Sequence, residues 1–242
     1  FHIQGMVNMK EDEKKFDKKE VVQAVVLAAG QPQAEPGLEG ILNDKPLCML
    51  EIGGKTLVEH QADILRSCGV NDIYVVSGYR SEKIKLDAAT ILSNRDFKTS
   101  GIAHSLMSAQ DRLKNKFAVV YSDIIFDRQI IEHLLDSPHA ITIVIDRAYQ
   151  TLPFRQKRLD LVTVKDSARE VNGRSLKLSN FKPVEKVGRG LLKEGATHEF
   201  IGIAFFQGKG LRELSQAWQE AQIKFEGRPF YEAPSVVKAD FN

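Results

Sequence analysis

The sequence predicts an α/β fold in which a doubly wound, mixed sheet carries a small antiparallel extension. Two observations predict it. Up to residue 145, apolar runs rich in β-branched residues alternate with stretches of helical periodicity. That alternation is typical of a parallel sheet covered on both faces. Beyond residue 146, short apolar runs separated by glycine and charged residues favour antiparallel strands laid against the parallel half.

Composition narrows the class of protein. The chain has 242 residues with 34 basic and 32 acidic side chains, a formal charge of +2. A charge so close to neutral argues against a dedicated nucleic-acid or membrane binder, because such binding rests on a large field of one sign. Two cysteines are too few for a disulfide framework, and no apolar run approaches the about 20 residues that span a bilayer. We expect a cytoplasmic protein that binds neither nucleic acid nor membrane.

The chain divides into a tail and one domain. Residues 1–20 hold five lysines and five acids without an apolar period, which predicts a charged, disordered tail or linker. Residues 21–242 contain the periodic segments, so we assign them to a single domain. Its first strand is expected within 21–30, a nearly continuous apolar run that ends in small residues.

The remaining elements follow in order. Residues 56–68 have apolar groups at amphipathic spacing and are closed by Gly69, which predicts a helix, and 72–78 is the second predicted strand. Further helices are predicted at 100–113, 128–135 and 211–223. Further strands are predicted at 117–121 and 140–145, and in the extension at 161–164, 174–178, 184–187 and 200–206.

Ligands of a doubly wound sheet bind at the carboxyl ends of its strands, so candidate residues are sought there. After the first strand, the small residues Ala28, Ala29 and Gly30 would let backbone N–H groups approach a phosphate. Lys45, held by the proline after it, would add a cation. An ordinary strand-to-loop glycine and a surface lysine are an equal alternative, because the pattern is neither GxGxxG nor a P-loop.

Three acids and one lysine are the other candidates. Asp123 follows the third strand between apolar residues and is suited to hold Mg²⁺ on a nucleotide phosphate, while Asp127 is expected to cap the next helix. Asp146 follows the fourth strand and contacts a metal or an acceptor, or else forms an ion pair with its neighbour in sequence. Lys186, on a short strand beside glycine, is placed to face an anion.

Covalent catalysis has no support in the sequence. The six histidines show no metal-ligand spacing, and no GxSxG motif occurs. Glu199 is an acid that enters a buried strand, where it needs a partner to offset its desolvation.

Taken in chain order, these residues resemble the nucleotidyltransferase family that activates sugar phosphates. The motifs that carry the resemblance are VVLAAG at 25–30, KPLCML at 45–50, IGGK at 52–55 and SGY at 77–79. Within that family, four later motifs resemble the cytidylyltransferases that act on 2-aminoethylphosphonate or 2-hydroxyethylphosphonate. They are SGIAHSL at 100–106, YSDIIFD at 121–127, VGRG at 187–190 and EFIGI at 199–203.

The resemblance implies a Rossmann-like, GT-A-like fold of the nucleotide-diphospho-sugar transferase kind. It also implies an enzyme that transfers CMP from CTP to a small phosphonate with Mg²⁺ and releases pyrophosphate. By position, the nucleotide site would comprise Leu27, Ala28, Ala29, Gly30, Gly78 and Ser105, with Ser105 near the cytosine. Lys45 would contact phosphate, Asp123 would bind the metal, and Lys186 would act with them in catalysis, with Asp146 and Glu199 at the acceptor.

Two departures from the family pattern stand out. The family has Gly-x-Gly-x-Arg after the first strand, whereas Gly30, Pro32 and Ala34 stand here, so one triphosphate anchor is missing. Family members also end in a Trp/Glu-Ile-Asp segment that supplies a second metal ligand. Residues 21–242 do not contain it, and we expect the domain to continue beyond them.

Other functions stay open from the sequence. A phosphocholine cytidylyltransferase or a sugar-1-phosphate nucleotidyltransferase would share the same motifs. The altered loop is also compatible with a non-catalytic, nucleotide-binding regulatory protein. The expected partners are CTP and a small phosphonate or phosphate ester, and the charged tail leaves room for a homo-oligomer or a fusion to another biosynthetic domain.

Overall fold

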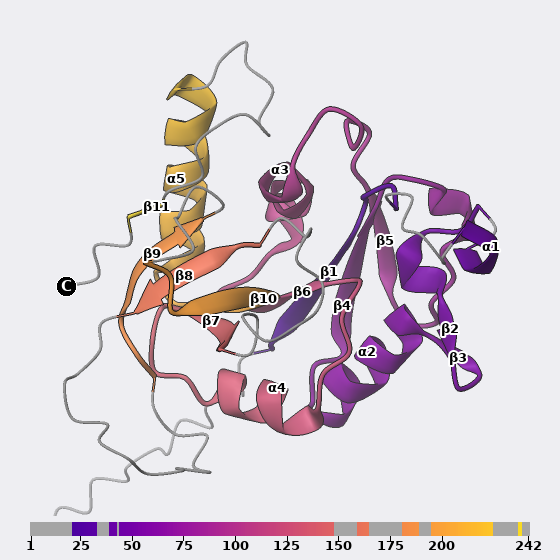
Figure 1. Cartoon of the computed structure of the whole chain (residues 1–242), viewed down its shortest axis with the longest axis horizontal. Helices are drawn as coiled ribbons and strands as arrows, with labels where there is room; N and C mark the ends of the chain where they lie inside the picture. Colours follow the sequence, from indigo (N-terminus) through magenta and orange to yellow (C-terminus); the bar gives the residue numbers. More distant parts are fainter. Residues whose placement is uncertain are drawn as a thin grey trace, which may run out of the picture.

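A nine-stranded mixed sheet forms the centre of the computed structural model, which describes residues 21–32, 39–42, 44–147, 159–164, 181–188, 195–224 and 237–238 (Figure 1). The strand order is β11-β9-β8-β10-β6-β1-β4-β5, and β7 also pairs with β10. The α/β fold with a mixed sheet predicted from the sequence is therefore confirmed. The expected tail at 1–20 and the expected strand at 174–178 lie outside the described residues.

The parallel half of the sheet is built around β1 (Gln23–Ala28), in which all six residues are buried. It pairs with β4 (Asp72–Ser77) on one side and with β6 (Lys116–Tyr121) on the other, and β5 (Thr90–Ser93) pairs with β4. Because both faces of β1 are covered, its apolar run needs no polar alternation.

The antiparallel half is organised by the long strand β10 (His198–Gln207). It pairs with β6, with β7 (Ile141–Asp146) and with β8 (Leu161–Val164). The strands β9 (Val184–Gly188) and β11 (Val237–Lys238) extend the sheet beyond β8.

The position of β7 differs from the simple alternation expected from the sequence. It was expected to continue the parallel series, but β10 lies between β6 and β7. Since β10 is antiparallel to both, β7 still runs in the same direction as β6. The carboxyl ends of β6 and β7 therefore lie toward the same edge of the sheet.

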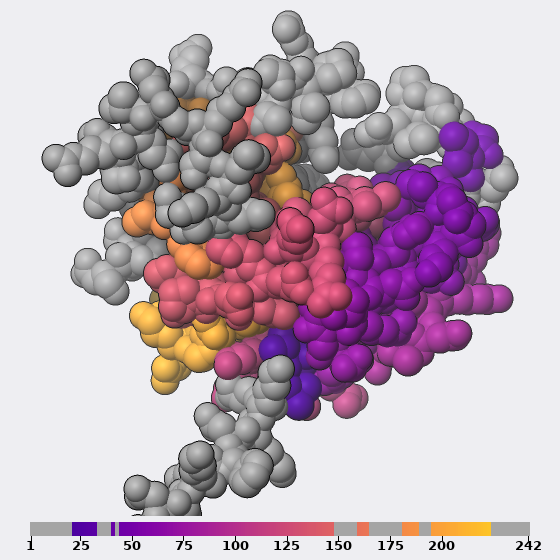
Figure 2. Space-filling view, turned by 90° about the horizontal axis from the view of Figure 1, so that it is seen from below, coloured from indigo at the N-terminus to yellow at the C-terminus, as the bar shows by residue number. Residues whose placement is uncertain are grey.

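Helices cover both faces of the sheet (Figure 1). One face is covered by α2 (Leu57–Ser67) and α4 (Arg128–Leu135), whose apolar side chains pack on Val26 and Val120 in one core cluster. The other face is covered by α3 (Ile102–Met107) and α5 (Gly210–Lys224), which join a second cluster with Val25 and Phe117. From below, the rose-coloured surface of the α4 region continues into the purple surface of the α2 region (Figure 2).

Short elements connect these layers: α1 (Glu39–Leu42), η1 (Leu47–Met49), β2 (Glu51–Ile52), β3 (Lys55–Thr56), η2 (Ser81–Lys83) and η3 (Gln110–Arg112). The helix predicted at 128–135 is confirmed at both ends. The helix predicted at 100–113 is shorter, because η3 replaces its last part. In the described part of the chain, no helix is long and apolar enough to cross a membrane.

Candidate active site

The loop that carries Asp123 leaves β6 beside the end of β1. Leu27 of β1 is level with Tyr121 of β6 in the parallel ladder. The backbone N–H of Ser122 then donates to the carbonyl oxygen of Leu27 at 3.3 Å. Asp123 is therefore one residue beyond the last tie between these strands, at the sheet edge where doubly wound folds bind their ligands.

The glycine after β4 lets the neighbouring loop pack against the end of β1. The backbone N–H of Tyr79 donates to the carbonyl oxygen of Ala29 at 3.0 Å. A Cβ atom added at Gly78 would lie 2.6 Å from that oxygen and 2.6 Å from Cβ of Phe97, so a side chain there would displace its neighbours. A Cβ atom added at Gly30 would meet no atom within 4 Å, which leaves space beside the strand end.

Ser105 is linked to the end of β4 through Asn94. The Asn94 side-chain amide donates to the hydroxyl oxygen of Ser105 at 3.0 Å, and both residues are buried. The backbone N–H of Asn94 donates to the carbonyl oxygen of Ser77 at 2.8 Å. Ser105 is thus held at the same edge as Gly78, and its contact with cytosine stays a prediction.

Two aromatic rings pack beside the Asp123 loop. The rings of Tyr121 and Phe200 meet edge to face, with centroids 5.6 Å apart. Gly202 of β10 has a φ of 87°, and an added Cβ atom there would lie 2.6 Å from the Tyr121 ring. The glycine therefore makes room for the ring at the end of β6.

Asp123 and Asp127, the two acids of this loop, differ in their place in the fold. The carboxylate of Asp123 is exposed and makes no hydrogen bond or ion pair with another described residue. Asp127 is the N-cap residue of α4, as predicted, but its side chain makes no capping hydrogen bond. The expected side-chain cap is therefore wrong, and Asp123 is the acid placed beside β1.

The side chains around Asp123 offer few protein ligands for Mg²⁺. Among the described residues, no group of three or more His, Cys, Asp and Glu side chains could hold a metal ion. Mg²⁺ in nucleotide-dependent enzymes needs only one or two carboxylates, because waters and phosphates complete its coordination. An unpaired carboxylate at the sheet edge fits that mode of binding. Magnesium at Asp123 stays a prediction.

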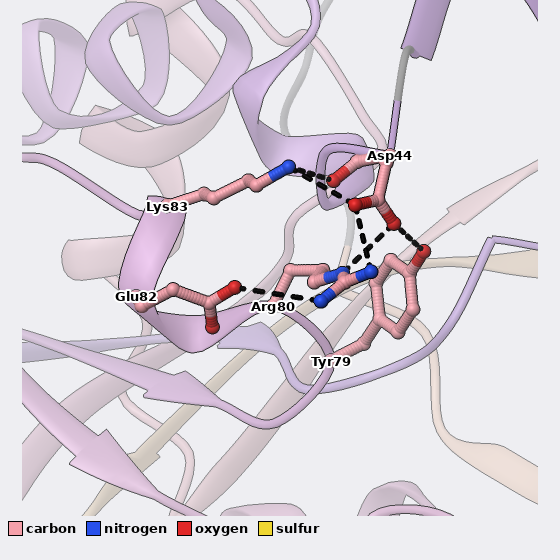
Figure 3. Close-up of polar contacts among 5 residues, drawn as sticks. All are labelled: Asp44, Tyr79, Arg80, Glu82 and Lys83. Atoms are coloured by element: carbon pink, nitrogen blue, oxygen red, sulfur yellow. Dashed lines mark hydrogen bonds and ion pairs between the residues drawn. The ribbon is translucent and has the colours of Figure 1, made fainter.

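A polar cluster around Asp44 joins the segment before Lys45 to the loop after β4 (Figure 3). The Asp44 carboxylate accepts hydrogen bonds from the Tyr79 hydroxyl at 2.9 Å, from Arg80 Nε at 2.8 Å and from Lys83 Nζ at 3.1 Å. Lys83 Nζ also donates to the backbone carbonyl oxygen of Asp44 at 2.8 Å. Sequence reasoning did not identify this cluster.

The cluster keeps Asp44 ionised. Hydrogen bonds from Arg80, Tyr79 and Lys83 lower the pKa of its carboxyl from 3.8 to about 2, and the charge of Arg80 adds to the effect. Glu82 lies 3.9 Å from the far side of the Arg80 guanidinium. The segment that leads to Lys45 is therefore tied to the loop after β4 at neutral pH.

Lys45 itself is held only loosely. Its ammonium lies 3.4 Å from a carboxylate oxygen of Glu51, and the two side chains are 44% and 63% exposed. An ion pair this exposed contributes little, because water screens it. The ammonium can therefore leave Glu51 for a phosphate without a large penalty.

Two further predicted residues face each other across strands. Glu199 of β10 is the register partner of Asp146 of β7, so their side chains are on the same face of the sheet. Beside them, Arg147 Nε donates to His198 Nε2 at 3.0 Å.

Lys186 lies in the antiparallel part of the sheet. It is exposed on β9, where Thr163 of β8 is its register partner. β8 joins β10 at His198 and Glu199, on the edge of β10 that also pairs with β6 and that lies opposite β7. The role of Lys186 at the acceptor stays a prediction.

Two sets of residues were missed from the sequence, and each had a weak signal. Asn94 follows a four-residue strand that was not predicted, and its Oδ1 accepts from the N–H of Asp96 at 3.0 Å, a turn that the sequence Asn-x-Asp favours. The partners of Asp44 are 35 to 39 residues away in sequence, so local patterns carry no sign of them.

Known proteins are similar to this chain in sequence and in fold. Residues 24–176 match the family model of the MobA-like NTP transferase domain. The chain is 24% identical over 200 residues to a CTP:phosphoglutamine cytidylyltransferase of Campylobacter jejuni subsp. jejuni, covering 76% of this chain and 77% of that protein. It is 31% identical over 115 residues to the UTP--glucose-1-phosphate uridylyltransferase AglF of Haloferax volcanii, covering 45% of this chain and 46% of that protein.

A solved structure shares the fold. The CTP:phosphocholine cytidylyltransferase LicC of Streptococcus pneumoniae superposes with a TM-score of 0.52 at 18% identity, covering 83% of this chain and 79% of that one.

Proposed function

This chain belongs to the family of MobA-like NTP transferase domains and is a nucleotidyltransferase, and from that premise we propose that it transfers CMP from CTP to a small phosphonate, 2-aminoethylphosphonate or 2-hydroxyethylphosphonate, with release of pyrophosphate. The similarity to a cytidylyltransferase over three quarters of the chain supports CTP as the nucleotide. The phosphonate is the finer part of the proposal and follows from the motifs of the sequence.

One observation carries the proposal: the unpaired carboxylate of Asp123 beside the end of β1. Ser122, its neighbour, is bonded to Leu27, and Leu27 is followed by the small residues up to Gly30. This arrangement offers backbone N–H groups for phosphates and a carboxylate for a cation at one edge. When bound there, Mg²⁺ would neutralise phosphate charge during the transfer.

The acceptor needs no general base. A phosphonate dianion already has an unprotonated oxygen near neutral pH, so the chain needs no histidine to remove a proton. The obstacle is repulsion between two phosphorus anions. Unit charges of like sign at contact cost about 1 to 4 kcal/mol between water and a protein surface, and several such terms add.

The cationic side chains of the site would offset that repulsion. In the proposal, Lys45 turns from Glu51 to the nucleotide phosphates, and Lys186 meets the acceptor from β9. Fixing both anions would align the attacking oxygen with the α-phosphorus, opposite the leaving pyrophosphate. Asp123 and Lys45 would thus act on the nucleotide, and Lys186 on the acceptor.

In the proposal, Asp146 and Glu199, which are register partners across β7 and β10, lie at the acceptor. The ammonium of 2-aminoethylphosphonate would bind a carboxylate there, whereas 2-hydroxyethylphosphonate has no positive charge to offer. Phosphocholine, which is also cationic, is the second candidate on the same observation. A sugar 1-phosphate has no such group.

Pyrophosphate release tests the proposal. The purified chain is assayed with each of the four nucleoside triphosphates against 2-aminoethylphosphonate, 2-hydroxyethylphosphonate, phosphocholine and hexose 1-phosphates. We expect CTP with 2-aminoethylphosphonate to give the highest kcat/KM. A preference for UTP with a hexose 1-phosphate would overturn the proposal, and CTP binding in calorimetry without turnover on any acceptor would support a regulatory protein instead.

A further inference from the structure

Gln61 is a buried glutamine whose side chain reaches the loop that carries Asp123. It lies on α2, and 1% of its surface is exposed. Its amide nitrogen donates to the carbonyl oxygen of Tyr121 at 2.9 Å and to that of Ile124 at 2.7 Å. Because carbonyl oxygens only accept, the nitrogen of the amide must face them. Both amide hydrogens are thus used on the residues that flank Ser122 and Asp123.

The other end of the same amide is left without a partner. The Oε1 atom of Gln61 is the one buried side-chain atom without a hydrogen bond that is recorded for the described residues. Such atoms are rare, because a buried oxygen that loses its hydrogen bonds to water and gains no other partner destabilises the fold. A methionine would fill similar space without that penalty. A glutamine at this buried position therefore indicates that its two donated bonds serve more than packing.

The helix that carries Gln61 is itself firmly placed. Thr56 and Glu59 form a reciprocal capping box at its first turn, with Glu59 Oε2 accepting from the N–H of Thr56 at 2.7 Å. The N–H of Leu57 donates to the carbonyl oxygen of Leu50 at 2.9 Å, and α2 packs against η1. Since η1 begins two residues after Lys45, α2 supports both the Lys45 segment and the Asp123 loop.

We propose that Gln61 is a positioning residue that fixes the backbone from Tyr121 to Ile124, so that the Asp123 carboxylate keeps its place relative to the Lys45 segment. This inference rests on the proposed function, in which Asp123 holds Mg²⁺ on the nucleotide. Gln61 touches no substrate and acts through two backbone carbonyl groups. Without its donors the loop would relax toward other partners, and the carboxylate would move away from the nucleotide phosphates.

A matched pair of variants separates positioning from simple stability. Gln61→Met removes both donors with little change in volume. Gln23→Met is the control, because Gln23 is also fully buried and its amide nitrogen donates to Asp72 Oδ2 at 2.8 Å and to the carbonyl oxygen of Arg112 at 3.0 Å. Gln23 begins β1, at the opposite end from the site. Gln23→Met loses one bond more than Gln61→Met, because Gln23 Oε1 also accepts from the N–H of Lys114 at 2.6 Å. Only Gln61 adjoins the Asp123 loop.

Two measurements are made on the full chain. Hydrogen exchange without ligand should show faster exchange of the amides at 122–125 in Gln61→Met than in Gln23→Met. Calorimetry of CTP binding with Mg²⁺ and with EDTA gives the gain in affinity that Mg²⁺ supplies. We expect that gain to fall by about tenfold or more in Gln61→Met, as for other residues that orient a metal ligand, and to be unchanged in Gln23→Met.

Each outcome decides the proposal. The positioning role would be overturned if the two variants lost the magnesium-dependent gain in CTP affinity equally. Unchanged hydrogen exchange of the amides at 122–125 would overturn it as well. Asp123→Asn is measured alongside. If Asp123→Asn keeps the magnesium-dependent gain in CTP affinity, the metal assignment of the proposed function is wrong. If Asp123→Asn loses that gain while Gln61→Met keeps it, only the role of Gln61 is wrong. Should Gln61→Met not fold, Gln61→Asn, whose shorter amide cannot reach both carbonyls, is read by the same criteria.

Discussion

Asp44 and Arg80 are 36 residues apart in the sequence, and their side chains bind each other while both residues hold a left-handed backbone. Their φ angles are 62° and 48°, and Arg80 Nη2 lies 2.7 Å from Asp44 Oδ2. Left-handed conformations are uncommon outside glycine, so each turn needs support from elsewhere in the fold. The contact gives that support to both turns at once and joins the Lys45 segment to the loop after β4.

Asp44→Asn is expected to weaken CTP binding more than it slows turnover. The amide would lose its charge toward Arg80 and Lys83, and the segment before Lys45 would be held less tightly. We expect KM for CTP to rise about two- to fivefold, with a smaller change in kcat. Asp63→Asn is the control, since Asp63 is a similarly exposed carboxylate that pairs with Lys55 at 2.6 Å away from the strand ends. Equal effects of the two substitutions on KM would contradict the prediction.

The same carboxylate gives stability a predictable dependence on pH. The Asp44 pKa is 3.8 in the unfolded reference and about 2 in the fold. Because the pKa is lower in the fold, the ionised Asp44 carboxylate stabilises the folded state. This contribution to stability is present in full above pH 3.8 and is lost as the pH falls from 3.8 through about 2. Urea unfolding of wild type and Asp44→Asn between about pH 6 and pH 2 measures this. We expect the difference in the free energy of unfolding between the two proteins to be constant down to about pH 4 and to shrink below it. A difference that grows on acidification would contradict the assignment of the lowered pKa to Asp44.

Gly78 and Gly30 are expected to respond differently to alanine. A Cβ atom at Gly78 would press on the Ala29 carbonyl oxygen, which cannot move without breaking its bond to Tyr79. We expect Gly78→Ala to lower the free energy of unfolding by about 1 to 3 kcal/mol, whereas Gly30→Ala has open space and should keep its stability. Urea titration of both variants tests this, and similar stabilities would show that the Gly78 contact is not tight.

Sequence patterns predicted what depends on neighbours in the chain and missed what depends on distant segments. The helix at 128–135 was predicted at both ends because its apolar spacing is local. The strand Thr90–Ser93 was missed because it is short and partly exposed at the edge of the sheet, so it lacks a long apolar run. The place of β7 depends on β10, more than fifty residues later, which inserts between β6 and β7.

The same distinction applies to the site. Asp123 could be selected from the sequence because a strand end and its flanking residues are local features. The contacts of Asp44 and of Gln61 could not, because each joins segments that are at least 35 residues apart. Candidate ligand-binding residues are thus easier to select from a sequence than the residues that support them.

Glu199→Gln is expected to change the choice of acceptor. It removes one of two carboxylates that face each other across β7 and β10. We expect kcat/KM to fall roughly three- to tenfold for 2-aminoethylphosphonate and to be unchanged for 2-hydroxyethylphosphonate, which has no ammonium. Glu185→Gln, on the exposed side of β9, controls for a general change in surface charge. A parallel loss for both acceptors would show that Glu199 does not recognise the amine.

Asp123→Asn is expected to remove turnover while the fold is retained. The carboxylate has no partner among the described residues, so its loss breaks no contact of the fold, and the amide is nearly the same size. An amide oxygen without a formal charge binds Mg²⁺ much more weakly, and we expect kcat to fall by at least about 100-fold with an unchanged melting temperature. Asp127→Asn is the matched control, because that acid is four residues along, is also exposed and makes no side-chain capping bond. Near wild-type turnover in Asp123→Asn, or an equal loss in both variants, would move the metal site away from the end of β6.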